Sequence, residues 1–153
     1  MAEARPTGTD TAGGPGRVLV ALYGVFALAT TSRAAVQLAT QFDRAPLAYL
    51  LSALAAVVYV VATVGLVRGG RPGRRTATIA CAVELAGVLI VGALSLADPA
   101  AFPDETVWSG FGRGYFYVPL VLPVLGLLWL RSLAAQNSPP PKSPPPPKSP
   151  PSP

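Results

Sequence analysis

Hydrophobic residues fall into four long blocks, which are separated by short polar, charged or glycine-rich connectors. Each block approaches the roughly 20 apolar residues that a helix needs to cross a bilayer, and proline or charge marks most of the block ends. We therefore expect an all-α, polytopic membrane protein with four transmembrane helices in a small bundle. The predicted spans cover residues 18–40, 47–67, 77–97 and 115–133.

The first span must include a charged residue to be long enough. Its purely apolar part, residues 18–29, would rise only about 18 Å as a helix, whereas the hydrocarbon core is about 30 Å thick. We expect the helix to continue to Thr40 and to carry Arg33 into the outer leaflet. A cleavable signal peptide is the competing interpretation, but polar and basic residues stand where a small-residue cleavage site is needed.

The two ends of the chain have compositions typical of disordered segments. Residues 1–17 are rich in Gly, Pro, Thr and charge without periodicity, and residues 138–153 repeat Ser-Pro-Pro units with two lysines. We expect a disordered leader and a proline-rich, disordered tail on either side of a membrane domain at 18–137. The PxxP spacings of the tail suit an aromatic groove, although a plain linker also explains this composition.

The basic residues predict the orientation of the chain. If the N-terminus is cytoplasmic, nine of the twelve Lys and Arg residues fall on the cytoplasmic side and two on the other, with Arg33 inside a span. The positive-inside rule then places both termini in the cytoplasm. Trp108 and Tyr115 at the outer boundary, and Trp129 at the inner one, agree with this orientation because aromatic residues gather at both membrane interfaces.

Composition excludes several classes of function. Hydrophobic residues make up 51% of the chain and charged residues only 12%, about half the charged share of a soluble domain. Histidine is absent and Cys81 is the single cysteine, which removes Ser-His-Asp and Cys-His catalytic arrangements and the usual metal ligands. The net charge of +5 forms no basic face with interleaved aromatic residues. We expect no catalytic residue, metal, cofactor or nucleic-acid partner.

Arg33 and Glu84 are the first functional candidates, because charges inside a bilayer are costly and usually serve a purpose. At 1.5 Å per residue, Arg33 lies about 22 Å from its inner helix end and Glu84 about 10 Å, so a direct ion pair would have to close about 12 Å. Tyr59, at about 12 Å, is level with Glu84 and could donate to its carboxyl. Tyr117 lies near the depth of Arg33 and could contact it through its hydroxyl or its ring.

Gln37 belongs to a polar stripe on the first span. Its neighbours on that face are Thr30, Arg33 and Thr40, spaced 3, 4 and 3 residues apart. The stripe could line a wet vestibule or bind a headgroup phosphate, or it could simply be an outer helix end that faces neighbours and headgroups. Small residues on the first two spans would permit close helix approach: Ala27, Thr31, Ala35, Ala39, Ala48, Ser52 and Ala56.

The connector at 98–114 is the longest of the chain and mixes aromatic, acidic and glycine residues. Phe102, Trp108 and Phe111 could lie in the interface or cover the outer mouth of the bundle, and we interpret the connector as a partner surface. The GFGRG run at 110–114 resembles a phosphate loop only in its glycines, since no strand precedes it and no Lys-Ser or Lys-Thr follows.

Three stretches together resemble a group of uncharacterised, small four-helix integral membrane proteins of actinobacteria. They are LYGVFALATTSRAAVQLAT, FDRAPLAYLLSALAAVVYVVAT and DETVWSGFGRGYFYVPLVLPVLGLLWL. The resemblance covers residues 18–131, and its most particular element is the segment from Trp108 to Trp129. It implies a bilayer environment in a bacterial plasma membrane and no catalytic positions.

These observations favour a non-enzymatic accessory or scaffold component of a membrane complex, in contact with a membrane-protein partner or with copies of itself. The alternative is a small transporter or channel-like homo-oligomer in which Glu84 supplies a proton or cation site and Arg33 contributes. In the accessory interpretation, Glu84 is a polar residue that holds helices together. A lipid-binding or lipid-modifying protein is a third hypothesis.

Overall fold

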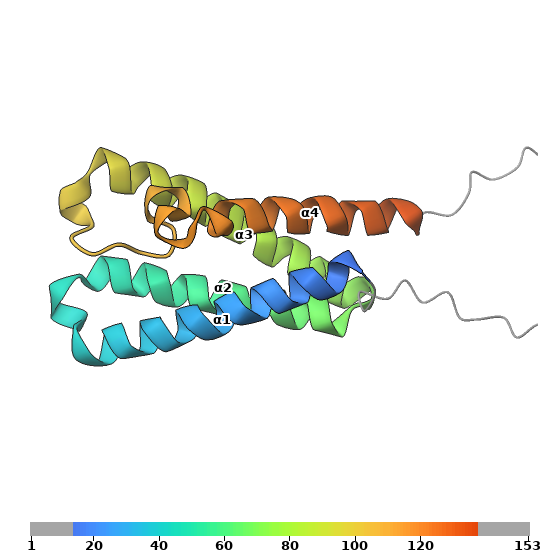
Figure 1. Ribbon diagram of the computed structural model, residues 1–153, viewed down its shortest axis with the longest axis horizontal. Coiled ribbons are helices and arrows are strands. Elements are labelled where there is room, and N and C mark those ends of the chain that lie inside the picture. Colours follow the sequence, from blue (N-terminus) through green and yellow to red (C-terminus); the bar gives the residue numbers. More distant parts are fainter. Residues whose placement is uncertain (1–13, 138–153) are drawn as a thin grey trace, which may run out of the picture.

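The structure is a computed structural model that describes residues 14–137, and it is a bundle of four α-helices (Figure 1). No strand occurs within this range. The all-α, four-span architecture predicted from sequence is therefore confirmed. The predicted tail, and the predicted leader apart from residues 14–17, lie outside the described residues. The helices are α1 (Pro15–Thr40), α2 (Pro46–Arg68), α3 (Gly70–Ala97) and α4 (Val118–Gln136).

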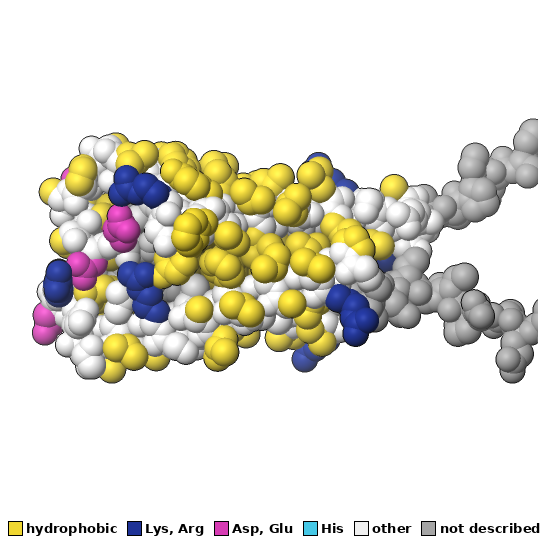
Figure 2. Space-filling view, viewed as in Figure 1, with side chains coloured by type: hydrophobic (Ala, Val, Ile, Leu, Met, Phe, Trp, Pro, Cys, Tyr) yellow, Lys and Arg dark blue, Asp and Glu magenta, His cyan; other side chains and the backbone are white. Residues whose placement is uncertain are grey.

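All four helices are long and apolar enough to cross a membrane. Large apolar side chains point outward along the bundle, among them Leu28, which is 72% exposed, and Val25, which is 64% exposed. Figure 2 shows this hydrophobic surface between the two ends, where most of the charged side chains lie. A water-soluble monomer rarely exposes so much continuous apolar surface. The fold is that of an integral membrane protein in contact with the lipid bilayer.

All four helices begin at residues other than those predicted, although α2 differs by only one residue. α1 starts at Pro15, three residues before the expected start, because proline is well tolerated in the first turn, where its missing N–H is not needed. α4 starts at Val118 and not at residue 115, since Phe116 and Tyr117 adopt the left-handed conformation, with φ of 54° and 59°. These two residues end the connector and do not belong to the helix.

The largest difference concerns the arginine-rich run at 68–75, which we expected to be a connector. Only Gly69, with a φ of 58°, separates α2 from α3, and the helix resumes at Gly70. The turn is this short because the two backbones nearly touch: a Cβ atom on Gly65 would lie 2.7 Å from the Ala77 nitrogen. Small residues allow such close approach between transmembrane helices.

Neighbouring helices in the chain pack side by side in an antiparallel arrangement. α1 contacts α2, α2 contacts α3 and α3 contacts α4, whereas α1 barely touches α4. Residues 14 and 137 emerge at the same end of the bundle, and the α1–α2 turn and the α3–α4 connector lie at the other end (Figure 1). We call these the terminal end and the connector end.

The α3–α4 connector is folded into the bundle. α4 has 19 residues against 28 in α3, and it begins partway along α3, so the connector occupies the remaining length (Figure 1). Two short 3₁₀ helices shape this segment, η2 (Pro99–Ala101) and η3 (Ser109–Tyr115). Val107 and Trp108 are only 1% and 2% exposed. The connector therefore completes the core at this end of the molecule.

Candidate functional site

Glu84 is completely buried between three helices. Its Oε2 atom accepts a hydrogen bond of 2.8 Å from the Tyr23 hydroxyl of α1, which also lies 3.2 Å from Cys81 Sγ. Gly126 of α4 faces the same point, since a Cβ atom there would lie 3.1 Å from Cys81 Sγ. A larger residue at this position would crowd the thiol and the Tyr23 hydroxyl. We call Tyr23, Tyr59, Cys81, Glu84 and Trp108 the core cluster.

Tyr59 and Trp108 bring unpaired polar atoms to the core cluster. The Tyr59 ring packs on Tyr23 at a centroid distance of 6.0 Å, and its hydroxyl lies within interaction range of the Glu84 carboxyl and the Trp108 indole. However, it makes no hydrogen bond of ordinary geometry with any described residue. The Glu84 Oε1 and Trp108 Nε1 atoms are also buried without such a bond in residues 14–137.

Tyr23 is therefore the partner of Glu84 that the sequence analysis missed. Tyr59 was the donor that its depth made possible, but the ordinary hydrogen bond to Glu84 comes from Tyr23. The same depth argument could have identified it, because Tyr23 lies five residues from the predicted start of the first span, or about 8 Å, against about 10 Å for Glu84. Depth alone could not distinguish the two tyrosines.

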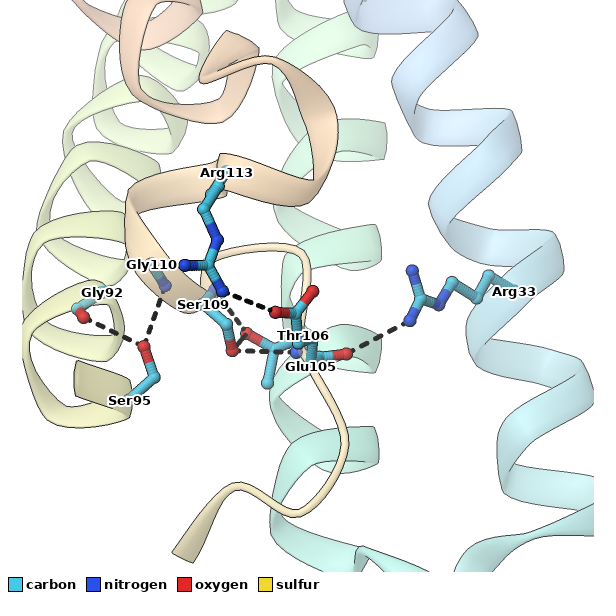
Figure 3. Close-up of polar contacts among 8 residues, drawn as sticks. All are labelled: Arg33, Gly92, Ser95, Glu105, Thr106, Ser109, Gly110 and Arg113. Carbon is cyan, nitrogen blue, oxygen red and sulfur yellow. Dashed lines mark hydrogen bonds and ion pairs between the residues drawn. The ribbon is translucent and has the colours of Figure 1, made fainter. Parts of the chain in front are cut away.

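Arg33 binds the connector and not Glu84. Its guanidinium group donates to the Tyr115 hydroxyl and, at 3.2 Å, to the Glu105 carbonyl oxygen, toward which it points in Figure 3. The guanidinium carbon also lies 5.8 Å from the centre of the Tyr115 ring. The predicted contact with Tyr117 is not made, and Tyr117 is 48% exposed. Each intramembrane charge thus has its own partners.

Hydrogen bonds within the connector fix its shape, and one further bond joins it to α3 (Figure 3). The Thr106 nitrogen donates to Ser109 Oγ at 2.9 Å, and the Ser109 nitrogen donates to Thr106 Oγ1 at 3.0 Å. The Gly110 nitrogen donates to Ser95 Oγ, also at 2.9 Å. These bonds satisfy backbone groups that would be costly to leave unpaired at this depth.

Acidic residues hold the outer edge of the connector. Tyr49 donates to Asp104, which also forms an ion pair of 3.2 Å with Arg44, and Arg113 pairs with Glu105 at 3.1 Å. Exposed ion pairs of this kind contribute little stability. The buried backbone and aromatic contacts are therefore the main attachment of the connector.

The three aromatic residues predicted as an interaction surface face inward. Trp108 lies in the core against Gly87, where a Cβ atom would come within 2.7 Å of its ring. Phe111 is half-buried against Gly92, and Phe102 is half-buried beside a cavity of about 240 Å³. The connector's fully exposed aromatic residue is Phe116, at 93%. Of the two positions considered for these residues, the burial of Trp108 fits a cover over the mouth of the bundle and not a surface that a partner reaches.

The polar stripe on α1 does not form a continuous hydrophilic face. The Thr30 and Thr40 hydroxyls donate to carbonyl oxygens of their own helix, both at 2.7 Å. Gln37 is half-buried, and its Oε1 atom lacks a hydrogen-bond partner among residues 14–137. Within the same range, no three His, Cys, Asp or Glu side chains gather in a way that could hold a metal ion.

The chain was also compared with known proteins. No family model matches it, and neither the curated proteins nor the solved structures contain a protein that matches it.

Proposed function

We propose that this membrane protein is a non-enzymatic accessory component of a membrane complex, and that a groove between α1 and α2 receives a transmembrane helix of its partner. The groove is the observation that carries the proposal. It has a volume of about 350 Å³ and an almost entirely apolar lining. The lining residues are Thr31, Ala34, Ala35, Leu38, Ala53, Ala56, Val57, Val60 and Val61.

The position and chemistry of the groove suit a helix within the bilayer. Its α2 wall runs from Ala53 to Val61, about 10 to 22 Å from the start of that helix. This stretch lies inside the hydrocarbon core, which is about 30 Å thick. Lipid gives apolar helices no hydrophobic driving force to associate, so association depends on close packing at small residues. Alanine and threonine form much of this surface, and its lining comes from α1 and α2 alone, so neither α3 nor α4 contributes to it.

The polar core supports the accessory function over transport. Glu84 has no exposed surface, so no solvent path reaches its carboxyl in this conformation. Arg33 is engaged by Tyr115 and Glu105 of the connector. Both charges hold segments of the fold together, which is the role of polar residues that join helices. The chain also lacks histidine, the most frequent catalytic acid and base.

A channel-like homo-oligomer is the second candidate. The unpaired Glu84 Oε1, Tyr59 hydroxyl and Trp108 Nε1 atoms favour it, because unsatisfied polar groups in a membrane core are costly and often belong to an ion or proton site. This function requires a conformation, or an assembly of several copies, in which the core cluster opens to water.

The groove is tested by purification of the tagged full chain from the membrane of its own host cell in mild detergent. Ala35 and Ala86 are both exposed within spans, but only Ala35 lines the groove. We expect Ala35→Phe to remove a co-purifying membrane protein by filling the groove, and Ala86→Phe to retain it. If both variants retain the partner, the partner does not bind in the groove. A particle that contains only this chain would contradict the accessory function and favour the channel.

We also propose that the chain lies in a bacterial plasma membrane, as its resemblance to small actinobacterial membrane proteins implies, and that both termini are cytoplasmic. The surplus of basic residues at the terminal end supports this orientation. Exposed Thr76 lies near that end, in α3. In a Cys81→Ala background, we expect Thr76→Cys to react with an impermeant maleimide only after the cells are opened. Labelling of intact cells would reverse the orientation.

A further inference from the structure

Three arginines of the terminal end stand on one rigid helical face. Arg71, Arg74 and Arg75 belong to the first two turns of α3, where we had expected a connector. Together with Thr78 they follow the i, i+3, i+4, i+7 spacing of a single helix face. Because α3 starts directly after Gly69, these side chains are held by a helix and not by a loop.

This face forms one wall of a cleft. The C-terminal part of α4 forms the other wall, through Leu130 and Ala134, and the cleft has a volume of about 650 Å³. That volume lies within the range of small-ligand sites. From Arg71 to Thr78 the cleft extends about 10 Å along α3, comparable to the depth of a headgroup layer.

The positive charge in the cleft has no counterpart within the chain as described. Outside the core, the acidic residues of 14–137 all lie at the connector end (Figure 2). Both ion pairs within this range also form there, so the three arginines take part in neither. Like charges three or four residues apart repel one another, and the positive end of the helix dipole adds to the repulsion. An external anion would relieve both effects.

We propose that this cleft binds the headgroup of an anionic phospholipid. Guanidinium groups match the geometry of a phosphodiester, to which each can donate two hydrogen bonds. Leu130 and Ala134 provide an apolar wall on the side of α4, against which the glycerol and the first methylenes of the lipid pack. This combination of a cationic wall and an apolar wall at the membrane surface distinguishes a phospholipid from a free phosphate.

The test compares two triple variants of the full chain in neutral detergent. The cleft variant is Arg71→Gln, Arg74→Gln, Arg75→Gln. The control variant is Arg17→Gln, Arg68→Gln, Arg131→Gln, which removes the same charge from residues that do not line the cleft. Binding of phosphatidylglycerol is measured by native mass spectrometry and by thermal shift, with phosphatidylcholine and inorganic phosphate as comparison probes.

We expect the cleft variant to lose at least about tenfold in phosphatidylglycerol affinity, which corresponds to the loss of a single charged hydrogen bond, and the control variant to stay within about twofold. Equal losses in both variants would show diffuse attraction and overturn the site. Equal binding of phosphatidylcholine would exclude anion recognition. Competition by millimolar inorganic phosphate would exclude a phospholipid as the specific ligand.

A conservative variant covers the case in which the cleft variant fails to fold. Replacement of the same three arginines by lysine retains the charge but removes the paired donors of the guanidinium group. We expect this variant to fold and to bind phosphatidylglycerol more weakly than the wild type by about three- to tenfold. Wild-type affinity in the lysine variant would contradict recognition by the guanidinium groups.

Discussion

Replacement of Trp108 by alanine is expected to lower the free energy of unfolding by about 3 kcal/mol, the low end of the range for removal of a buried tryptophan. The indole is 2% exposed and packs against Gly87 of α3. Its loss leaves a cavity where the connector enters the bundle, and the surrounding helices can close it only in part. Unfolding in mixed detergent micelles, followed by circular dichroism, measures the difference.

Phe116→Ala is the matched control for this experiment. Phe116 lies in the same connector but is 93% exposed, so its removal is expected to change the unfolding free energy by less than about 0.5 kcal/mol. If both variants lose the same stability, Trp108 does not anchor the connector. The connector would then behave as a surface loop, and its burial would not contribute to the fold.

Replacement of Tyr23 by phenylalanine is expected to lower the free energy of unfolding by about 1 to 2 kcal/mol. The variant keeps the ring but removes the hydroxyl that donates to Glu84 Oε2 at 2.8 Å, and a buried acceptor is then left without its donor. Measured hydrogen bonds between transmembrane helices are often weaker than this, about 0.6 kcal/mol on average. We expect a larger value here because the acceptor is a carboxyl group.

Tyr59→Phe is the control for the core cluster. Its hydroxyl makes no ordinary hydrogen bond with a described residue, so its removal is expected to leave stability unchanged or slightly higher. The same micelle titration measures both variants. A greater loss for Tyr59→Phe than for Tyr23→Phe would show that Tyr59 is the principal donor to Glu84, as the depth argument first indicated.

The two variants also bear on function. If the unpaired atoms of Tyr59, Glu84 and Trp108 serve only packing, Tyr59→Phe should leave the protein folded and its partner bound. The channel-like alternative gives these atoms an ion or a proton to bind. The accessory function requires the core cluster only for packing, whereas the transport function requires it to bind an ion or a proton.

Sequence reasoning was most accurate where the bilayer itself sets the constraint. The thickness of the hydrocarbon core fixes how long an apolar helix must be, so the four spans and the intramembrane positions of Arg33 and Glu84 could be read from the chain. The depth argument also separated the two charges by about 12 Å, and the structure gives each its own partners. The arginine-rich turn was the exception, because glycine and proline usually end a helix.

That exception has a local cause. Pro72 lies in the first turn of α3, where proline is tolerated because it lacks a donor that the helix does not need. Gly69 and Gly70, with φ of 58° and 62°, supply the positive φ values that reverse the chain. The sequence alone does not show that these residues form a tight helix–helix turn, because that turn depends on the close approach of α2 and α3 at Gly65 and Gly73.

By itself, the sequence determined the number and order of the helices, since these follow from transfer of apolar segments into lipid. Only the tertiary structure decided which faces meet: Tyr23 and not Tyr59 on Glu84, Tyr115 and not Tyr117 on Arg33, and Trp108 in the core. The physical reason is that a transmembrane helix is apolar on all sides, so its pattern shows depth but not rotation. Rotation is set by close packing at glycines and small residues, which depends on all four helices together.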